Sequence, residues 1–206
     1  MRVRQTDHRG FSLIELMIVV AVMMVMAGWA IMGAGSSLSY KANAAMATVV
    51  TQMRQARELA ISSRRNVLVT FTTPNKIQLA VQTLPGEAPA ATMAPVYLND
   101  NAANAMQFTV FPGIPDTPMA FGNSQAVTLA PAAGGTAGLA VLFTTQGSFV
   151  GTTAASNYSQ VGNSNFVNAS IFLGMPGKTQ TARAVTILGG TGRVRSFTWD
   201  GNNWNE

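Results

Sequence analysis

Side chains that could carry out chemistry are few in this chain of 206 residues. There is no cysteine, and the one histidine, His8, lies close to the amino terminus. Beyond His8 the sequence therefore has no Ser-His-Asp or Cys-His nucleophile and no His/Cys zinc site. A carboxylate-only site would have to combine acids that are scattered over residues 66–206, which the sequence leaves open. We expect a protein that is not an enzyme and has no cofactor and no metal.

One acidic side chain, Glu15, stands out by its position. It is the only charge between Phe11 and Ala34, in a run that also lacks proline. About twenty apolar residues are enough for a helix to cross a bilayer. An acidic side chain at the bilayer centre costs about 2.5–3.5 kcal/mol on insertion scales, and less near the interface. The positive end of the helix dipole also favours a carboxylate in the first turn. The pattern predicts a transmembrane helix over residues 11–34.

The six residues Gly10-Phe11-Ser12-Leu13-Ile14-Glu15 resemble the processing site of type IV pilins and type II secretion pseudopilins. The resemblance implies that residues 1–10 are a leader and that a prepilin peptidase cuts between Gly10 and Phe11. It also implies that Phe11 becomes N-methylated and that Glu15 meets the amino terminus of a neighbouring subunit during assembly. Such a partly desolvated ion pair is favourable only when both partners are present.

Two other interpretations of this segment are weaker. An ordinary signal-anchor helix would leave Glu15 among the lipid headgroups. A secretory signal peptide would be cut near Gly28-Trp29-Ala30, but its apolar region usually covers only about 7–15 residues. The apolar run here is longer and continues past that point, so the prepilin interpretation is favoured.

The net charge of +5 and the pI near 10.2 are unevenly distributed. Residues 1–10 carry +2, residues 11–65 carry +3 and residues 66–206 are neutral. The global pI is therefore no evidence for a DNA-binding head. Positive residues beside the first membrane helix tend to stay in the cytoplasm. We expect a single-pass inner-membrane protein with a cytoplasmic amino terminus and a periplasmic carboxy-terminal head.

Residues 35–65 continue the helical pattern in amphipathic form. Apolar side chains recur at helical spacing on one face, and polar side chains occupy the other. The apolar face consists of Met46, Val49, Val50, Met53, Ala56, Leu59 and Ala60. Such a stripe needs a packing partner, so this half of the helix is expected to lie against a globular head.

Residues 66–206 change to a β-rich pattern and form the predicted head. Residues 67–73 and 77–82 predict a hairpin. Six further runs are candidate strands: 106–111, 126–129, 138–144, 169–173, 184–188 and 194–199. Two segments rich in small and turn-forming residues predict loops: 84–104 and 151–168. The expected fold class is α+β, pilin-like, with a long amino-terminal helix packed on an antiparallel β-sheet head.

Two head motifs resemble the GspH/FimT group of minor pilins. Residues 143–148 resemble its F-x-x-x-G turn, and Gly192-Arg193-Val194-Arg195 resembles its carboxy-terminal G-R-x-R segment. The resemblance implies a subunit at or near the tip of a short filament. Its partners would be other pilins or pseudopilins, the prepilin peptidase, the inner-membrane assembly platform and the membrane. One implied function is the type II secretion pseudopilus; the alternative is DNA uptake through Gly192, Arg193 and Arg195.

The basic residues of the last segment allow two interpretations. On a strand, Arg193 and Arg195 project to one face and Val194 to the other. Together with Lys178 and Arg183 they predict a modest basic patch for phosphates. In the other interpretation, solvated arginines on a final edge strand discourage unwanted edge pairing.

Asp200-Gly201 lies between Trp199 and Trp204 and predicts a tight turn. The oxygen-bearing side chains near Asp200 are also compatible with a calcium ion, which is the weaker of the two interpretations.

Overall fold

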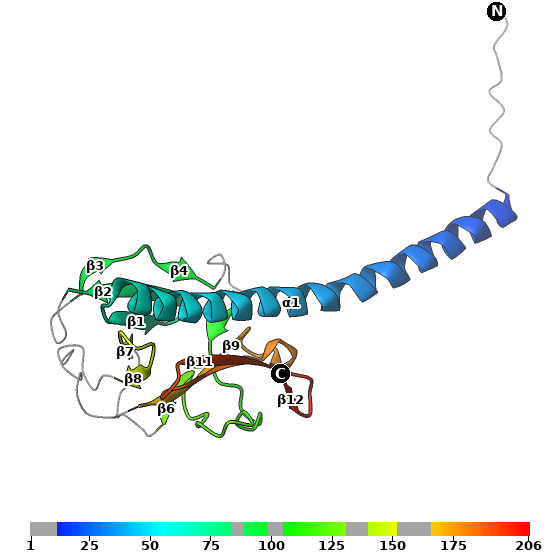
Figure 1. Ribbon diagram of the computed structural model, residues 1–206. Helices are drawn as coiled ribbons and strands as arrows, with labels where there is room; N and C mark the ends of the chain where they lie inside the picture. Colours follow the sequence, from blue (N-terminus) through cyan, green and yellow to red (C-terminus); the bar gives the residue numbers. More distant parts are fainter. Residues whose placement is uncertain (1–11, 84–88, 99–104, 131–139, 152–165) are drawn as a thin grey trace, which may run out of the picture. The chain divides into compact units, whose positions relative to one another are not determined.

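The computed structural model describes residues 12–83, 89–98, 105–130, 140–151 and 166–206 (Figure 1). The chain divides into two compact units, Met1–Leu38 and Ser39–Glu206, each of which is described by itself. Gly10 and Phe11 lie outside the described residues, as does the rest of the predicted leader.

Helix α1 covers Leu13–Ser63. It begins after Ser12, whose carbonyl oxygen accepts hydrogen bonds from the N–H groups of Glu15 and Leu16 at 3.0 and 3.2 Å. It ends before Arg64, which has a left-handed φ of 52°.

In the amino-terminal unit, the described apolar side chains of α1 from Leu13 to Met26 are exposed. Among the helical residues that the structure describes, none form a helix that is both long enough and apolar enough to span a membrane. The segment predicted to cross the membrane, residues 11–34, extends into residues 28–34, whose side chains lie outside the described part.

In the second unit, one face of α1 is fully buried at the i, i+3, i+4 spacing of an amphipathic helix. The buried residues are Ala42, Ala45, Val49, Met53, Ala56 and Ala60, each 0% exposed. The predicted stripe is confirmed at the last four, whereas Met46, Val50 and Leu59 lie at its partly buried margins. Alanines rather than large side chains dominate the stripe, which lets the helix backbone approach the strands closely.

The first sheet is antiparallel and has six described strands in the order β3-β2-β1-β7-β8, with β4 also paired to β2. Its members are β1 (Val67–Thr72), β2 (Lys76–Gln82), β3 (Pro89–Thr92), β4 (Val96–Tyr97), β7 (Ala140–Phe143) and β8 (Phe149–Gly151). The predicted hairpin is confirmed by the β1–β2 register from Val67↔Val81 to Thr72↔Lys76. The loop prediction for 84–104 is wrong at β3 and β4, because pairing with β2 orders residues of weak strand propensity.

The second sheet is also antiparallel, with six described strands in the order β12-β11-β10-β9-β5 and β6 paired to β9. Its members are β5 (Gln107–Phe108), β6 (Val127–Ala130), β9 (Asn168–Gly174), β10 (Arg183–Leu188), β11 (Arg193–Trp199) and β12 (Trp204–Asn205). A short 3-10 turn, η1 (Thr179–Thr181), precedes β10. The predicted α+β class is confirmed, with two sheets in place of the single one expected.

Both sheets contact the second half of α1. Arg57 on the helix donates a hydrogen bond to the β7–β8 turn, and Asn43 accepts one from Arg183 of β10. On the other face of the second sheet, Trp204 packs edge-to-face on Trp199 and donates its indole N–H to the carbonyl oxygen of Pro115 at 2.8 Å. The Trp199–Trp204 contact holds the carboxy-terminal end of β11, the strand that carries the predicted arginines.

Candidate functional site

Only part of the predicted processing and assembly site is described. Glu15 is an exposed side chain in the first turn of α1. Its predicted partners in processing, Gly10 and Phe11, lie outside the described residues, so the geometry of the cut site stays a prediction.

The two glycines of the head motifs lie against each other. Gly147, in the β7–β8 turn, has φ +78°, and Gly192, at the end of the β10–β11 turn, has φ +63°. A Cβ atom on Gly192 would overlap the carbonyl oxygen of Gly147 and come within 3.0 Å of the Arg57 side chain. Arg57 Nε donates a hydrogen bond to that same oxygen at 3.2 Å. We call Arg57, Gly147 and Gly192 the glycine junction.

The glycine junction borders a basic groove. The groove has a volume of about 670 Å³ and lies between α1 and the start of β11. Its lining consists of Arg54, Arg57, Glu58, Thr191, Gly192, Arg193, Val194, Arg195 and Glu206. Four arginines and two glutamates give the lining a net charge of +2. We call it the arginine groove. Its β11 residues could be predicted from the sequence, whereas Arg54 and Arg57 could not, because nothing local in the sequence links the helix to this turn.

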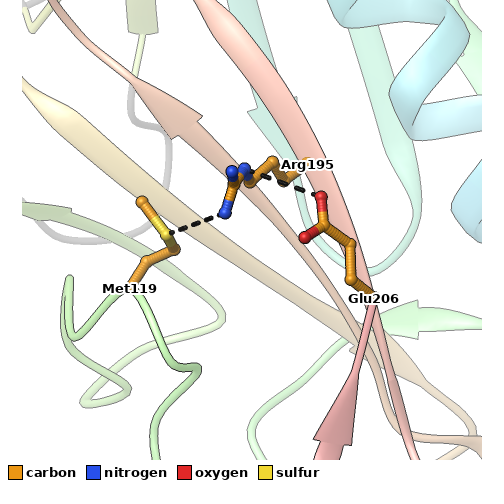
Figure 2. A network of polar contacts seen from close by, with 3 residues as sticks. All are labelled: Met119, Arg195 and Glu206. Carbon is orange, nitrogen blue, oxygen red and sulfur yellow. Dashed lines mark hydrogen bonds and ion pairs between the residues drawn. The ribbon is translucent and has the colours of Figure 1, made fainter.

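Arg195 is held in place from two sides (Figure 2). Its Nε atom lies 3.6 Å from Oε1 of Glu206, and Nη1 donates to the sulfur of Met119 at 3.8 Å. The side chains of Arg195 and Glu206 are 32% and 54% exposed. A solvent-exposed pair of this kind contributes only about 0–1 kcal/mol. The ion pair therefore orients Arg195, but it is weak enough for a carboxylate of another molecule to displace that of Glu206.

Arg193 and Arg195 alternate with Val194 as predicted. Arg193 pairs with Leu188, Val194 with Ile187 and Arg195 with Thr186. Both arginines also line a smaller cavity of about 110 Å³ with Met119, Thr186 and Leu188.

The predicted basic patch is wrong in one member, Arg183. This residue is 3% exposed, with Nε donating to Asn43 Oδ1 at 2.8 Å and Nη1 donating to the carbonyl oxygens of Gln180 and Ala182. Burial lowers the pKa of the Arg183 guanidinium, because desolvation disfavours its charged form. Arg183 fastens β10 to α1. Lys178 is exposed but does not line the arginine groove.

Asp200 forms the predicted tight turn. Its carboxylate accepts hydrogen bonds from the N–H groups of Asn203 and Asn202 and from the side chain of Asn205, at 2.7–2.8 Å. These bonds lower the pKa of the Asp200 carboxyl by stabilising its charged form. Among the residues the structure describes, no cluster of three His, Cys, Asp or Glu side chains could hold a metal ion.

Comparison with known proteins identifies the amino-terminal segment. The sequence family described as the prokaryotic N-terminal methylation motif matches residues 6–31, which include Gly10, Phe11 and Glu15. The match supports the resemblance to type IV pilins and pseudopilins and, with it, membrane anchoring.

Two further comparisons concern the chain as a whole. No curated protein sequence matches it significantly. Among solved structures, it is similar to the crystal structure of the type IV minor pilin FimU of Pseudomonas aeruginosa (strain PAO1), with 16% sequence identity and a TM-score of 0.44. That similarity extends over 83% of this chain and 94% of the other.

Proposed function

We propose that this protein is a minor pseudopilin, a structural subunit at or near the tip of a type II secretion pseudopilus that supports protein export. The observation that carries the proposal is the N-terminal methylation motif over residues 6–31, with Glu15 in the first turn of a helix that leads into a β-rich head. The chain acts by assembling and not by catalysis.

In this proposal the amino-terminal segment performs two steps. A prepilin peptidase cuts between Gly10 and Phe11 and methylates the new amino terminus. The cation formed on Phe11 of one subunit then pairs with the Glu15 carboxylate of a neighbouring pilin at the membrane boundary. The inner-membrane assembly platform moves the paired subunits outward, and the heads remain in the periplasm.

The test is replacement of Glu15. Glu15→Val should leave membrane insertion intact, because it removes a polar group that is costly in lipid. It should nevertheless abolish co-purification with the other pilins, since removing one partner of a buried ion pair costs up to about 3–5 kcal/mol. Glu15→Asp keeps the charge and serves as the matched control. Unchanged co-purification of the Val variant would contradict a role for Glu15 in assembly.

A second candidate function is capture of DNA for uptake, and the four arginines of the arginine groove favour it. Contact with two to four phosphates would give weak, sequence-independent binding whose salt dependence has a slope near −0.9 per phosphate. The full-length protein in detergent is titrated with duplex DNA at low and moderate salt. Binding should weaken in Arg193→Gln/Arg195→Gln and persist in the control Arg65→Gln/Lys178→Gln. No binding at low salt would eliminate this candidate.

A further inference from the structure

The outer edge of β11 is only partly covered. Strand β12 pairs with it at Thr198↔Asn205 and Trp199↔Trp204. Along the part of the chain that the structure describes, no strand pairs with the outer side of β11 from Arg193 to Phe197. An open edge of this length is a template for pairing with another extended chain.

The register shows which backbone groups this edge presents. Trp199 donates its N–H to the carbonyl oxygen of Ala182, on the β10 side, at 3.2 Å. Because hydrogen-bonded and non-hydrogen-bonded pairs alternate in an antiparallel ladder, the N–H and C=O groups of Val194 and Ser196 point away from β10. They face the open edge, where the backbone of an added strand could form hydrogen bonds with them.

The arginine groove borders the same stretch of β11. Arg193 and Arg195 flank Val194, while Arg54 and Arg57 reach the groove from α1. These charges disfavour a basic strand at the edge and favour an acidic one, whose carboxylates would enter a lining of net charge +2. Phosphate oxygens would meet the same charges and could accept from the N–H groups of Val194 and Ser196, but, unlike a peptide, they offer no N–H donor to the C=O groups.

The chain itself supplies an example of the expected contact. Strand β12 runs antiparallel to β11, and the next residue, Glu206, places its carboxylate 3.6 Å from Arg195 Nε. An extended segment with an acidic side chain therefore already fits beside the end of this edge (Figure 2).

We propose that the β11 edge from Arg193 to Phe197 and the arginine groove together bind an extended acidic segment of a partner protein as an added strand. Backbone pairing with Val194 and Ser196 holds the segment, and the groove arginines select its carboxylates. The surface belongs to the unit Ser39–Glu206, so it is independent of the processing motif on which the proposed function rests.

The experiment measures binding of a fluorescent ten-residue peptide of alternating valine and glutamate to the full-length protein in detergent. Two altered peptides separate the contribution of charge from that of backbone pairing. The first carries glutamine in place of glutamate. The second keeps its charges but is N-methylated at alternate amides, so that it cannot form a ladder along one edge. We expect each to bind roughly tenfold more weakly, because the first loses the ion pairs and the second the backbone hydrogen bonds.

Protein variants locate the site. Arg193→Gln/Arg195→Gln should weaken binding roughly tenfold, whereas Arg65→Gln/Lys178→Gln, which removes two exposed cations outside the groove, should not. Ser196→Pro removes an outward N–H without touching the β10 ladder and should also weaken binding. Should that variant fail to fold, the N-methylated peptide still tests the edge.

Three results would overturn the proposal. Equal binding of the N-methylated peptide would show attraction by charge alone. Equal binding by the Arg193→Gln/Arg195→Gln variant would place the site elsewhere. Binding of duplex DNA without binding of the peptide would assign the groove to phosphates instead.

Discussion

At the scale of single residues, the glycine junction gives the Gly192 position of the G-R-x-R segment a structural role. Gly192 has a left-handed backbone and no room for a side chain against Gly147 and Arg57. The alternation of Arg193 and Arg195 could be predicted, because it follows from the period of a strand. The meeting of residues 57, 147 and 192 could not, because it depends on how distant elements pack and leaves no local pattern.

Gly192→Ala should therefore destabilise the head while every arginine stays in place. A non-glycine residue in left-handed conformation costs about 1–2 kcal/mol, and overpacking adds about 1–3 kcal/mol. The free energy of unfolding in detergent should fall by the sum of these two costs. Denaturant titration followed by tryptophan fluorescence measures the change. Gly190→Ala, where an added Cβ meets nothing within 4 Å, is the matched control. Equal stability of the two variants would contradict the glycine junction.

At the scale of elements, every run predicted as a strand contains one in the structure, and the described strands outside those runs, β3, β4, β8 and β12, are short. β1, β2, β10 and β11 were found because their own residues favour strands. The two-residue strands β4 and β12 were missed, since they exist only through pairing with a longer neighbour. The stripe on α1 was predicted where its alanines Ala56 and Ala60 follow Val49 and Met53. Its first members, Ala42 and Ala45, were missed because alanines alone give little hydrophobic contrast.

The buried alanines of α1 predict that the helix tolerates little added volume. Ala56→Leu inserts three carbons where the side chain is 0% exposed and should lower the free energy of unfolding by about 1–3 kcal/mol. Gln55→Leu, at the exposed neighbouring position, should change it by less than about 0.5 kcal/mol. Chemical unfolding of both variants in detergent makes the comparison. If the two variants were equally stable, the close packing of α1 against the strands would be wrong.

At the scale of the whole molecule, the chain consists of two compact units. The amino-terminal unit carries the methylation motif, and the unit Ser39–Glu206 carries the arginine groove and both sheets. The charge pattern did not predict this division, because the boundary at Leu38/Ser39 lies within α1 whereas the net positive charge continues to residue 65. The number of sheets was not predictable, since strand propensity does not say which strands pair. The proposed function depends on the amino-terminal unit being processed.

Mass spectrometry of the protein from membranes of its native host tests that dependence most directly. Intact mass and the amino-terminal peptide together identify the first residue and its modification. We expect a chain that begins at Phe11 with one methyl group on its amino nitrogen. Gly10→Ala should reduce this species, because a side chain at Gly10 crowds the peptidase. A protein that begins at Ile31, or one that keeps residues 1–10, would contradict the assignment as a processed pilin-type subunit.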